Sequence, residues 1–330
     1  MAGDRMYAAA PLEEGPSLVR SIEVLKKGGG FFEAPRWRDD SWYVSDFYRA
    51  GVFAIDPDGS EREVMGGHGQ PSGLGWLADG SMLVVSMLDD RILRRYPDDT
   101  VVEHADLSSL SVGHLNDMLV DPHGRAWVGC FGYRTRPERP VTSRLIRVDP
   151  DGSAVVAAED LYFPNGRVML PDGCTLVVGE TTGNRYSAFT VSPDGSLTDR
   201  RVWAQFGPTP DPGRGYDPAL RSLVDWRARA AVADPVPVVA ADGCCLDRDG
   251  CIWAADIVNR RCVRVAQGGW ILEEIRAPGE LLYVACMLGG DDGRTLLICA
   301  APSFEGSRQK AAMDAELHTV RVEVPRAGLP

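Results

Sequence analysis

The chain has 330 residues, of which 44% are hydrophobic and 25% are charged, and its formal net charge is −12. This composition is that of a globular protein with enough apolar side chains to bury a sizeable core. Because phosphate binding needs a basic face, the negative charge and the lack of a basic cluster argue against a nucleic-acid partner. No apolar run approaches the roughly 20 residues that cross a bilayer, so we expect no membrane segment.

The N-terminal residues and the cysteines suggest a location in the cell. Residues 1–6 have no apolar segment of the kind that begins a secretory signal. The eight cysteines show no CxxC pair and no Cys/His pair at zinc spacing, and most of them lie in apolar runs. We therefore expect a cytoplasmic protein whose cysteines are buried thiols rather than disulfides or ligands.

A four-residue turn recurs between short apolar runs. Each turn ends in glycine, which accepts the positive φ that closes a hairpin, and several have proline at the second position. A chain of many similar hairpins is typical of a radial array of small antiparallel sheets. The turns lie at residues 56–59, 77–80, 121–124, 149–152, 170–173, 192–195 and 247–250.

The apolar runs form a unit that repeats along the chain. Each unit begins with an inner strand, continues into a strand rich in Val, Leu, Trp and Ala, and returns in a third strand that mixes apolar and basic residues. The first three spacings between units are about 40, 43 and 49 residues, which is the length of a four-stranded propeller blade. The inner strands of the six units start near Glu33, Gly73, Asn116, Asn165, Asp242 and Val284.

These units predict an all-β fold, a six-bladed β-propeller with four antiparallel strands per blade. The last unit supplies only three strands, whereas residues 18–25 form a strand without a blade of its own. We expect this N-terminal strand to complete the sixth blade and close the ring, which removes exposed sheet edges. Residues 1–330 are predicted to form one domain. A loop and short helix inserted at about 207–236 are expected to form a lid around Tyr216.

Common catalytic signatures are absent from the sequence. It contains no GxSxG elbow, no HExxH pair, no P-loop and no glycine fingerprint after a first strand. The Asp-Pro-Asp-Gly turns lack the flanking helices and the glutamate at position twelve that an EF-hand requires. The chemistry must therefore come from another pattern.

Oxygen-bearing side chains recur where the inner strands begin, at Glu33, Asn116, Asn165 and Asp242. At these positions side chains point toward the central channel, where carboxylates and amides are costly unless something pairs with them. One hard divalent cation would do so, calcium most naturally, with magnesium, manganese or zinc as alternatives. The competing interpretation is that these residues merely cap turns where the blades begin.

At these residues the chain resembles the gluconolactonase/regucalcin (senescence marker protein) family of six-bladed propellers, with diisopropylfluorophosphatase as a more distant relative. The resemblance runs from about residue 31 to residue 300. It implies that Glu33, Asn165 and Asp242 bind the metal directly, while Asn116 joins them or contacts the substrate. The matching segments are residues 33–37, 116–118, 121–125, 127–129, 165–166 and 241–255.

The resemblance implies hydrolysis of a lactone or related ester. The metal would polarise the carbonyl and lower the pKa of a water. Asp242 would orient or deprotonate that water, and Asn116 would steady the developing oxyanion. Family members that act on sugar lactones often have arginine two positions before the asparagine of the third blade. This chain has His114 there, so a sugar lactone is not implied, and His114 is a candidate substrate contact.

Apolar and aromatic residues of the rim loops are expected to form a substrate wall, with Phe131 and Tyr162 as predicted substrate contacts. Ordinary packing between blades is the alternative for each of them. The set comprises Phe47, Tyr48, Met87, Phe131, Tyr133, Tyr162 and Phe163.

The sequence thus predicts a metal-dependent lactonase that acts on a small molecule and is a monomer or a weak homo-oligomer. Three other classes stay open. The ring could be an interaction disc with structural calcium, since propellers serve many functions. It could be a metal-dependent lyase, isomerase or cyclase. It could also be a metal-independent enzyme of the strictosidine-synthase type, which the joint presence of Glu33, Asn165 and Asp242 disfavours.

Overall fold

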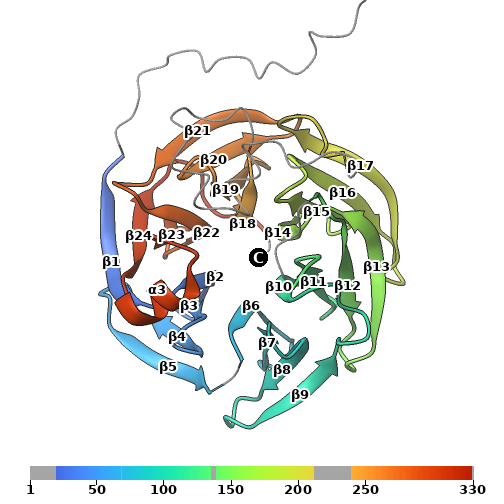
Figure 1. Ribbon diagram of the computed structural model, residues 1–330, viewed down its shortest axis with the longest axis horizontal. Coiled ribbons are helices and arrows are strands. Elements are labelled where there is room, and N and C mark those ends of the chain that lie inside the picture. Colours follow the sequence, from blue (N-terminus) through green and yellow to red (C-terminus); the bar gives the residue numbers. More distant parts are fainter. Residues whose placement is uncertain (1–19, 68, 135–138, 212–238, 329–330) are drawn as a thin grey trace, which may run out of the picture.

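Six antiparallel sheets surround a central axis in the computed structural model, which describes residues 20–67, 69–134, 139–211 and 239–328 (Figure 1). Each sheet has four strands, so the prediction of a six-bladed β-propeller is confirmed. The helix among the described residues is short, and none there is long and apolar enough to cross a membrane.

The strands fall into four concentric sets. The inner strands are β2 (Phe32–Arg38), β6 (Pro71–Trp76), β10 (Leu115–Val120), β14 (Pro164–Met169), β18 (Ala241–Leu246) and β22 (Leu282–Gly289). The second strands are β3 (Ser41–Asp46), β7 (Met82–Ser86), β11 (Ala126–Cys130), β15 (Thr175–Glu180), β19 (Ile252–Asp256) and β23 (Thr295–Ala301). The third strands are β4 (Gly51–Ile55), β8 (Arg91–Arg95), β12 (Ser143–Val148), β16 (Arg185–Val191), β20 (Arg261–Ala266) and β24 (Ala315–Arg321). The outer strands are β5 (Glu61–Gly66), β9 (Val101–Asp106), β13 (Ala154–Leu161), β17 (Leu197–Gln205), β21 (Trp270–Arg276) and β1 (Ile22–Gly29).

The N-terminal strand closes the ring, as predicted. In the sixth blade β1 pairs antiparallel with β24, with Ile22 opposite Val320, and the strand order is β1-β24-β23-β22. Figure 1 shows this junction as a blue strand beside a red one. The sixth blade thereby gains its fourth strand from the other end of the sequence.

The recurrent turns have the geometry that their glycines require. In all seven, the glycine has φ between 68° and 87°, and its N–H donates to the carbonyl three residues earlier at 2.8–3.0 Å. Each turn joins the first strand of a blade to the second, or the third to the fourth. All seven therefore lie on the face opposite the starts of the inner strands.

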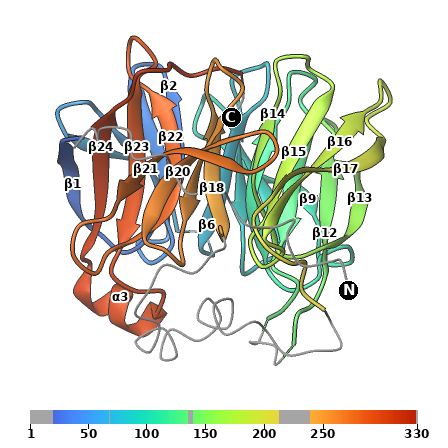
Figure 2. The same cartoon turned by 90° about the horizontal axis from the view of Figure 1, so that it is seen from above.

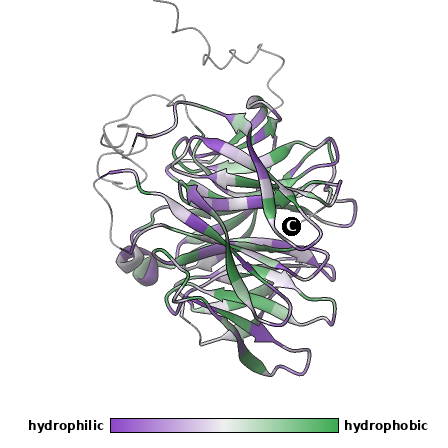
Figure 3. Cartoon of the chain, turned by 90° about the vertical axis from the view of Figure 1, so that its right-hand side faces the viewer, coloured by the Kyte–Doolittle hydropathy of each residue, from purple (hydrophilic) through white to green (hydrophobic). Residues whose placement is uncertain are grey.

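Burial decreases from the axis outward. Every residue of β10, β14 and β18 is buried, whereas β13 and β17 in the outer set are largely exposed or half-buried. Figure 3 shows hydrophobic stretches within the blades and hydrophilic residues in many connecting turns. Three tryptophans of the second strands, Trp42, Trp127 and Trp253, are fully buried and fill space between the sheets.

Two features differ from the sequence predictions. The structure has a helix, α3 (Gly306–Ala312), between β23 and β24, and Figure 2 shows it projecting beyond one face of the ring. Seven cysteines are buried, but Cys174 is exposed because it follows the turn between β14 and β15 instead of lying in a strand. Most of the expected insertion at 207–236, with Tyr216, lies outside the described residues.

Candidate functional site

A cavity of about 200 Å³ lies at the axis, where the inner strands begin. It receives residues from blades one, three, four, five and six, which are far apart in the sequence. The residues that line it are Phe31, Glu33, Phe47, Asn116, Phe131, Tyr133, Phe163, Asn165, Thr181, Thr182, Asp242, Ile257 and Phe304. All four predicted metal ligands are therefore in one cavity.

These four residues share one register position in their blades. Each follows the inner-strand residue that pairs with the last residue of the second strand. The register then skips, which marks a β-bulge or irregularity. In blade one the skip comes just after Glu33, which still pairs with Ser45, and in the other three blades the skip includes the ligand residue. A bulge bends the strand and re-aims a side chain, so the repeated fold directs all four side chains to the axis. The pairs that precede them are Phe32 with Asp46, Leu115 with Cys130, Pro164 with Glu180, and Ala241 with Asp256.

The strands that carry Asn165 and Asp242 approach each other closely. Nδ2 of Asn165 donates to Oδ1 of Asp242 at 2.5 Å, and both side chains are buried. A Cβ added at Gly166 would lie 2.2 Å from the backbone oxygen of Asp242, so only glycine allows this approach. The two predicted ligands thus form a preorganised pair.

The two carboxyl groups of the site resist ionisation. Burial raises the pKa of Asp242 to about 8, and the nearby charge of Asp117 acts in the same direction. Burial also raises the pKa of Glu33 well above its ordinary value, as does the charge of Asp242. A backbone bond from Ala34 to Oε2 of Glu33 opposes this only in part. The positive charge of Arg36 also opposes the rise, and it does not offset the effect of burial.

The donor set fits a hard divalent cation. Nδ2 of Asn116 is buried without a hydrogen-bond partner, which is unusual for an amide, so its N–H groups are available to donate to a bound molecule while its oxygen can face a cation. Two carboxylates and two amide oxygens are ligands of the type that calcium prefers. Within the described residues no three His, Cys, Asp or Glu side chains gather as a metal cluster, because half of this set is asparagine.

Three buried charged residues lie under the cavity and were not predicted. Nη2 of Arg36 contacts Oδ1 of Asp117 at 3.0 Å. Arg167 donates to the carbonyl oxygen of Asn165 at 2.9 Å and 2.6 Å, and burial lowers its pKa to about 10. Each follows a predicted ligand by one to three residues, which was the signal available in the sequence.

The wall of the cavity is largely aromatic. On one side Phe31 and Phe47 stack with ring centroids 5.1 Å apart, and Phe304 lies 5.9 Å from Phe31. On the other side the rings of Phe131 and Phe163 are 4.4 Å apart. Phe163 has φ of 55°, which is unusual for a bulky side chain and turns this segment toward the axis.

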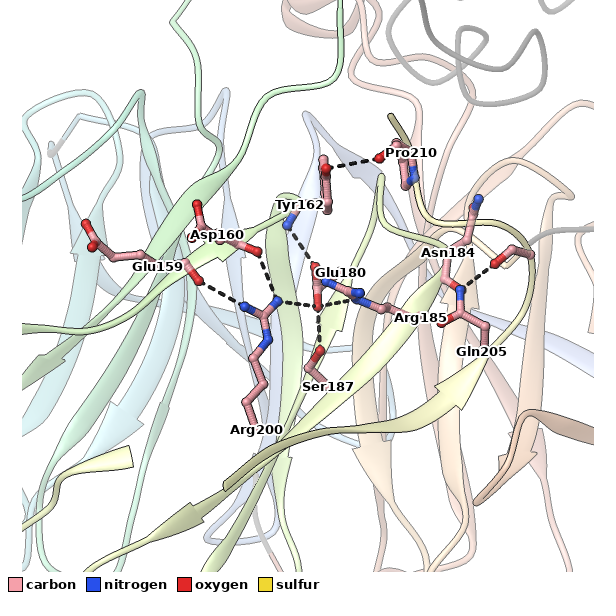
Figure 4. A network of polar contacts seen from close by, with 11 residues as sticks. Glu159, Asp160, Tyr162, Glu180, Asn184, Arg185, Ser187, Arg200, Gln205 and Pro210 are labelled. Atoms are coloured by element: carbon pink, nitrogen blue, oxygen red, sulfur yellow. Dashed lines mark hydrogen bonds and ion pairs between the residues drawn. The ribbon is translucent and has the colours of Figure 1, made fainter. Parts of the chain in front are cut away.

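Of the three predicted substrate contacts, only Phe131 is among the residues that line the cavity. His114 approaches Arg134 instead, with 3.4 Å between Nδ1 and Nη1. The hydroxyl of Tyr162 donates to the carbonyl of Pro210 at 3.0 Å (Figure 4). Tyr162 lines a separate groove of about 570 Å³. Of the other rim residues, Tyr48 and Met87 do not line the cavity.

Comparison with known proteins places this chain in a family. Residues 31–302 match the model described as SMP-30/Gluconolactonase/LRE-like region, so the chain belongs to this family. It is 26% identical to a 6-deoxy-6-sulfogluconolactonase of Pseudomonas putida, over 93% of this chain and 96% of that protein. It is 24% identical to a pentonolactonase of Haloferax volcanii, over 90% and 92%. A calcium-binding protein, regucalcin, from Agrobacterium tumefaciens has the same fold, with TM-score 0.71, 18% identity and coverage of 94% and 97%.

Proposed function

We propose that this protein is a metal-dependent hydrolase that opens a small lactone or a related ester. The observation that carries the proposal is the convergence of Glu33, Asn116, Asn165 and Asp242 on one cavity that no described lysine or arginine lines. Two full-length relatives are named as lactonases, and a structural neighbour is described as calcium-binding. We therefore assign one divalent cation to the cavity, with calcium as the first candidate.

The residues of the site have complementary chemical roles in this proposal. A divalent cation bound there would polarise the carbonyl and make a water more acidic. Asp242 accepts the proton of the attacking water, and its bond from Asn165 fixes the orientation of the carboxylate. Nδ2 of Asn116, which has no partner in the free protein, donates to the oxyanion as it develops.

The lining of the cavity favours an apolar substrate. Apart from the four proposed ligands, its polar side chains among the described residues are Tyr133, Thr181 and Thr182, and no described lysine or arginine lines it. A polyhydroxylated ring would leave hydroxyl groups against phenylalanine, at a cost of about 1–3 kcal/mol for each one without a partner. The volume is below the roughly 300 Å³ of the smallest drug-sized pockets. An aliphatic or aromatic lactone with one ring fits these limits.

A panel of lactones tests the proposal. Chelator-stripped protein is assayed with calcium, magnesium, manganese or zinc restored singly, on sugar, aliphatic and aromatic lactones, beside Asp242→Ala. We expect turnover that needs metal, prefers the apolar rings and is lost in the variant. If a folded protein that binds metal opens none of these lactones, the alternatives are a non-hydrolytic enzyme or a structural-calcium disc.

A further inference from the structure

Three fully buried carboxylates occupy one register position in the ring. They are the last residues of the second strands in blades one, four and five, and each has zero exposed surface. These are the blades that carry Glu33, Asn165 and Asp242. The other three blades have small neutral residues at the equivalent position. The six residues in blade order are Asp46, Ser86, Cys130, Glu180, Asp256 and Ala301.

Each of these carboxylates binds the backbone just ahead of a proposed ligand. Asp46 accepts from the N–H groups of Gly30 at 2.8 Å and Phe31 at 3.0 Å. Glu180 accepts from Tyr162 at 2.9 Å, as Figure 4 shows. The same contact recurs in blade five, where Asp256 accepts from Ala240 at 3.2 Å. The segment that leads into each ligand is thereby held by a charge-assisted bond.

The residue after each carboxylate returns a hydrogen bond to the same segment and also lines the cavity. The three bonds run from the N–H of Phe47 to the carbonyl of Phe31 at 3.1 Å, from Thr181 to Phe163 at 3.1 Å, and from Ile257 to Ala240 at 3.4 Å. Phe47, Thr181 and Ile257 are all cavity residues. The same backbone bond runs from Phe131 to His114 at 2.8 Å behind Cys130, so it belongs to the fold, and the carboxylates add the bond to the segment ahead of each ligand.

An arginine accompanies each carboxylate. Nε of Arg185 lies 2.7 Å from Glu180, and Nε of Arg261 lies 2.8 Å from Asp256. Arg49 lies farther from Asp46, at 3.9 Å. Buried ion pairs are weak contributors to stability, because desolvation offsets their attraction. The second, third and sixth blades fold with the same strand order and a neutral residue instead, so the fold itself does not require the charge.

We propose that Asp46, Glu180 and Asp256 are positioning residues that hold Glu33, Asn165 and Asp242 in the geometry that binds a divalent cation. This inference rests on the proposed metal site. It separates the four ligand candidates into two groups, because blade three has Cys130 in place of the acid. Asn116 is thus the member of the set without a carboxylate behind it, in keeping with a role toward the substrate.

Calcium binding to the chelator-stripped protein, measured by calorimetry, tests the inference. Asp256→Asn is compared with Asp247→Asn, a matched control in the same blade. Asp247 is also fully buried, accepts from the backbone of Asp249 and Cys251 at 3.0 Å, and pairs with Arg264 at 2.6 Å. It lies in a turn on the opposite face, away from the cavity.

We expect Asp256→Asn to weaken calcium binding about ten- to a hundredfold, as loss of an outer-shell partner does, and Asp247→Asn to change it less than twofold. Asp46→Asn provides the same measurement in another blade if Asp256→Asn does not fold. Melting of each metal-free variant shows whether the fold is retained. If the wild-type protein binds calcium and the cavity-side variants bind it equally well, the positioning inference is wrong but the proposed metal site stands. If the wild-type protein binds no divalent cation, the proposed metal site fails and the inference falls with it.

Discussion

Asn165 donates a hydrogen bond from Nδ2 to Oδ1 of Asp242, and so joins β14 to β18 across 77 residues of sequence. An amide that donates through its nitrogen keeps its carbonyl oxygen for another partner, and a carboxylate that accepts through one oxygen keeps the second. The pair is thus ordered before any ligand arrives. Such preorganisation lowers the cost of binding a cation.

Replacement of the carboxylate should separate metal binding from folding. Asp242→Asn keeps the size of the side chain and removes the charge, so we expect calcium affinity to fall at least a hundredfold and lactone turnover to disappear. The metal-free variant should melt no lower than the wild type at pH 8, because the buried acid with a raised pKa is gone. Differential scanning calorimetry with and without calcium measures both effects. Asp151→Asn, in an exposed turn, is the control, and a calcium-induced rise in Tm that persists in Asp242→Asn would contradict the assignment.

Calcium affinity should increase as pH rises from 6 to 8. Asp242 has a pKa of about 8 and that of Glu33 is also raised, so calcium must displace protons from the site below pH 8. We expect the calcium Kd to decrease about tenfold for each pH unit between 6 and 8 if one proton is released, and to level off above pH 8. Calorimetric calcium titrations in buffers of different ionisation enthalpy give the number of protons that are released on binding. A flat profile across this window would show that the two carboxyl groups are already ionised.

The stability of the metal-free protein should decrease with rising pH, whereas its calcium affinity increases. The pKa of Asp242 is higher in the folded chain than its ordinary value of 3.8, so the native state binds more protons than the unfolded state between about pH 4 and pH 8. The contribution of Asp242 to the free energy of unfolding therefore decreases as pH rises through this window. We expect the difference in Tm between Asp242→Asn and the wild type to increase from pH 5 to pH 8. Saturating calcium should abolish this increase, and a constant difference would argue against a raised pKa.

The fold could be predicted because its signals are local and repeated. The seven glycine turns specify where hairpins close, and the unpaired strand near residues 18–25 indicates how the ring closes. Helix α3 was missed because it is short and occupies a connection between two strands of one blade. Cys174 was misjudged because its position in a turn outweighs the general tendency of cysteine to be buried.

The site was predictable only to the extent that it follows the repeat. Four ligand candidates share a register position, and that position is visible in a sequence alignment of the blades. The carboxylates Asp46, Glu180 and Asp256 pair with the residues that directly precede three of these candidates, and strand pairing of this kind is not visible in the sequence of a single blade. The direction of His114 depends on Arg134, which lies in a different connection, between β11 and β12, and adjacency to Asn116 in sequence does not determine it.

Phe131 in the aromatic wall and His114 should differ in their effect on substrate affinity. Phe131 lines the cavity and packs against Phe163, so Phe131→Ala removes apolar contact with a bound ring. Loss of about 1.5 kcal/mol of burial corresponds to a rise in KM of about tenfold for an aromatic lactone. We expect kcat to change little, because the ring does not touch the reacting atoms and contributes equally to ground and transition states. His114→Ala is the matched comparison from the adjoining segment, and its KM should stay within twofold of the wild type because the imidazole faces Arg134. Steady-state kinetics on one aromatic and one sugar lactone give KM and kcat for the wild type and each variant. An equal rise in KM for both variants would show that the imidazole of His114 contacts the substrate, as the sequence predicted.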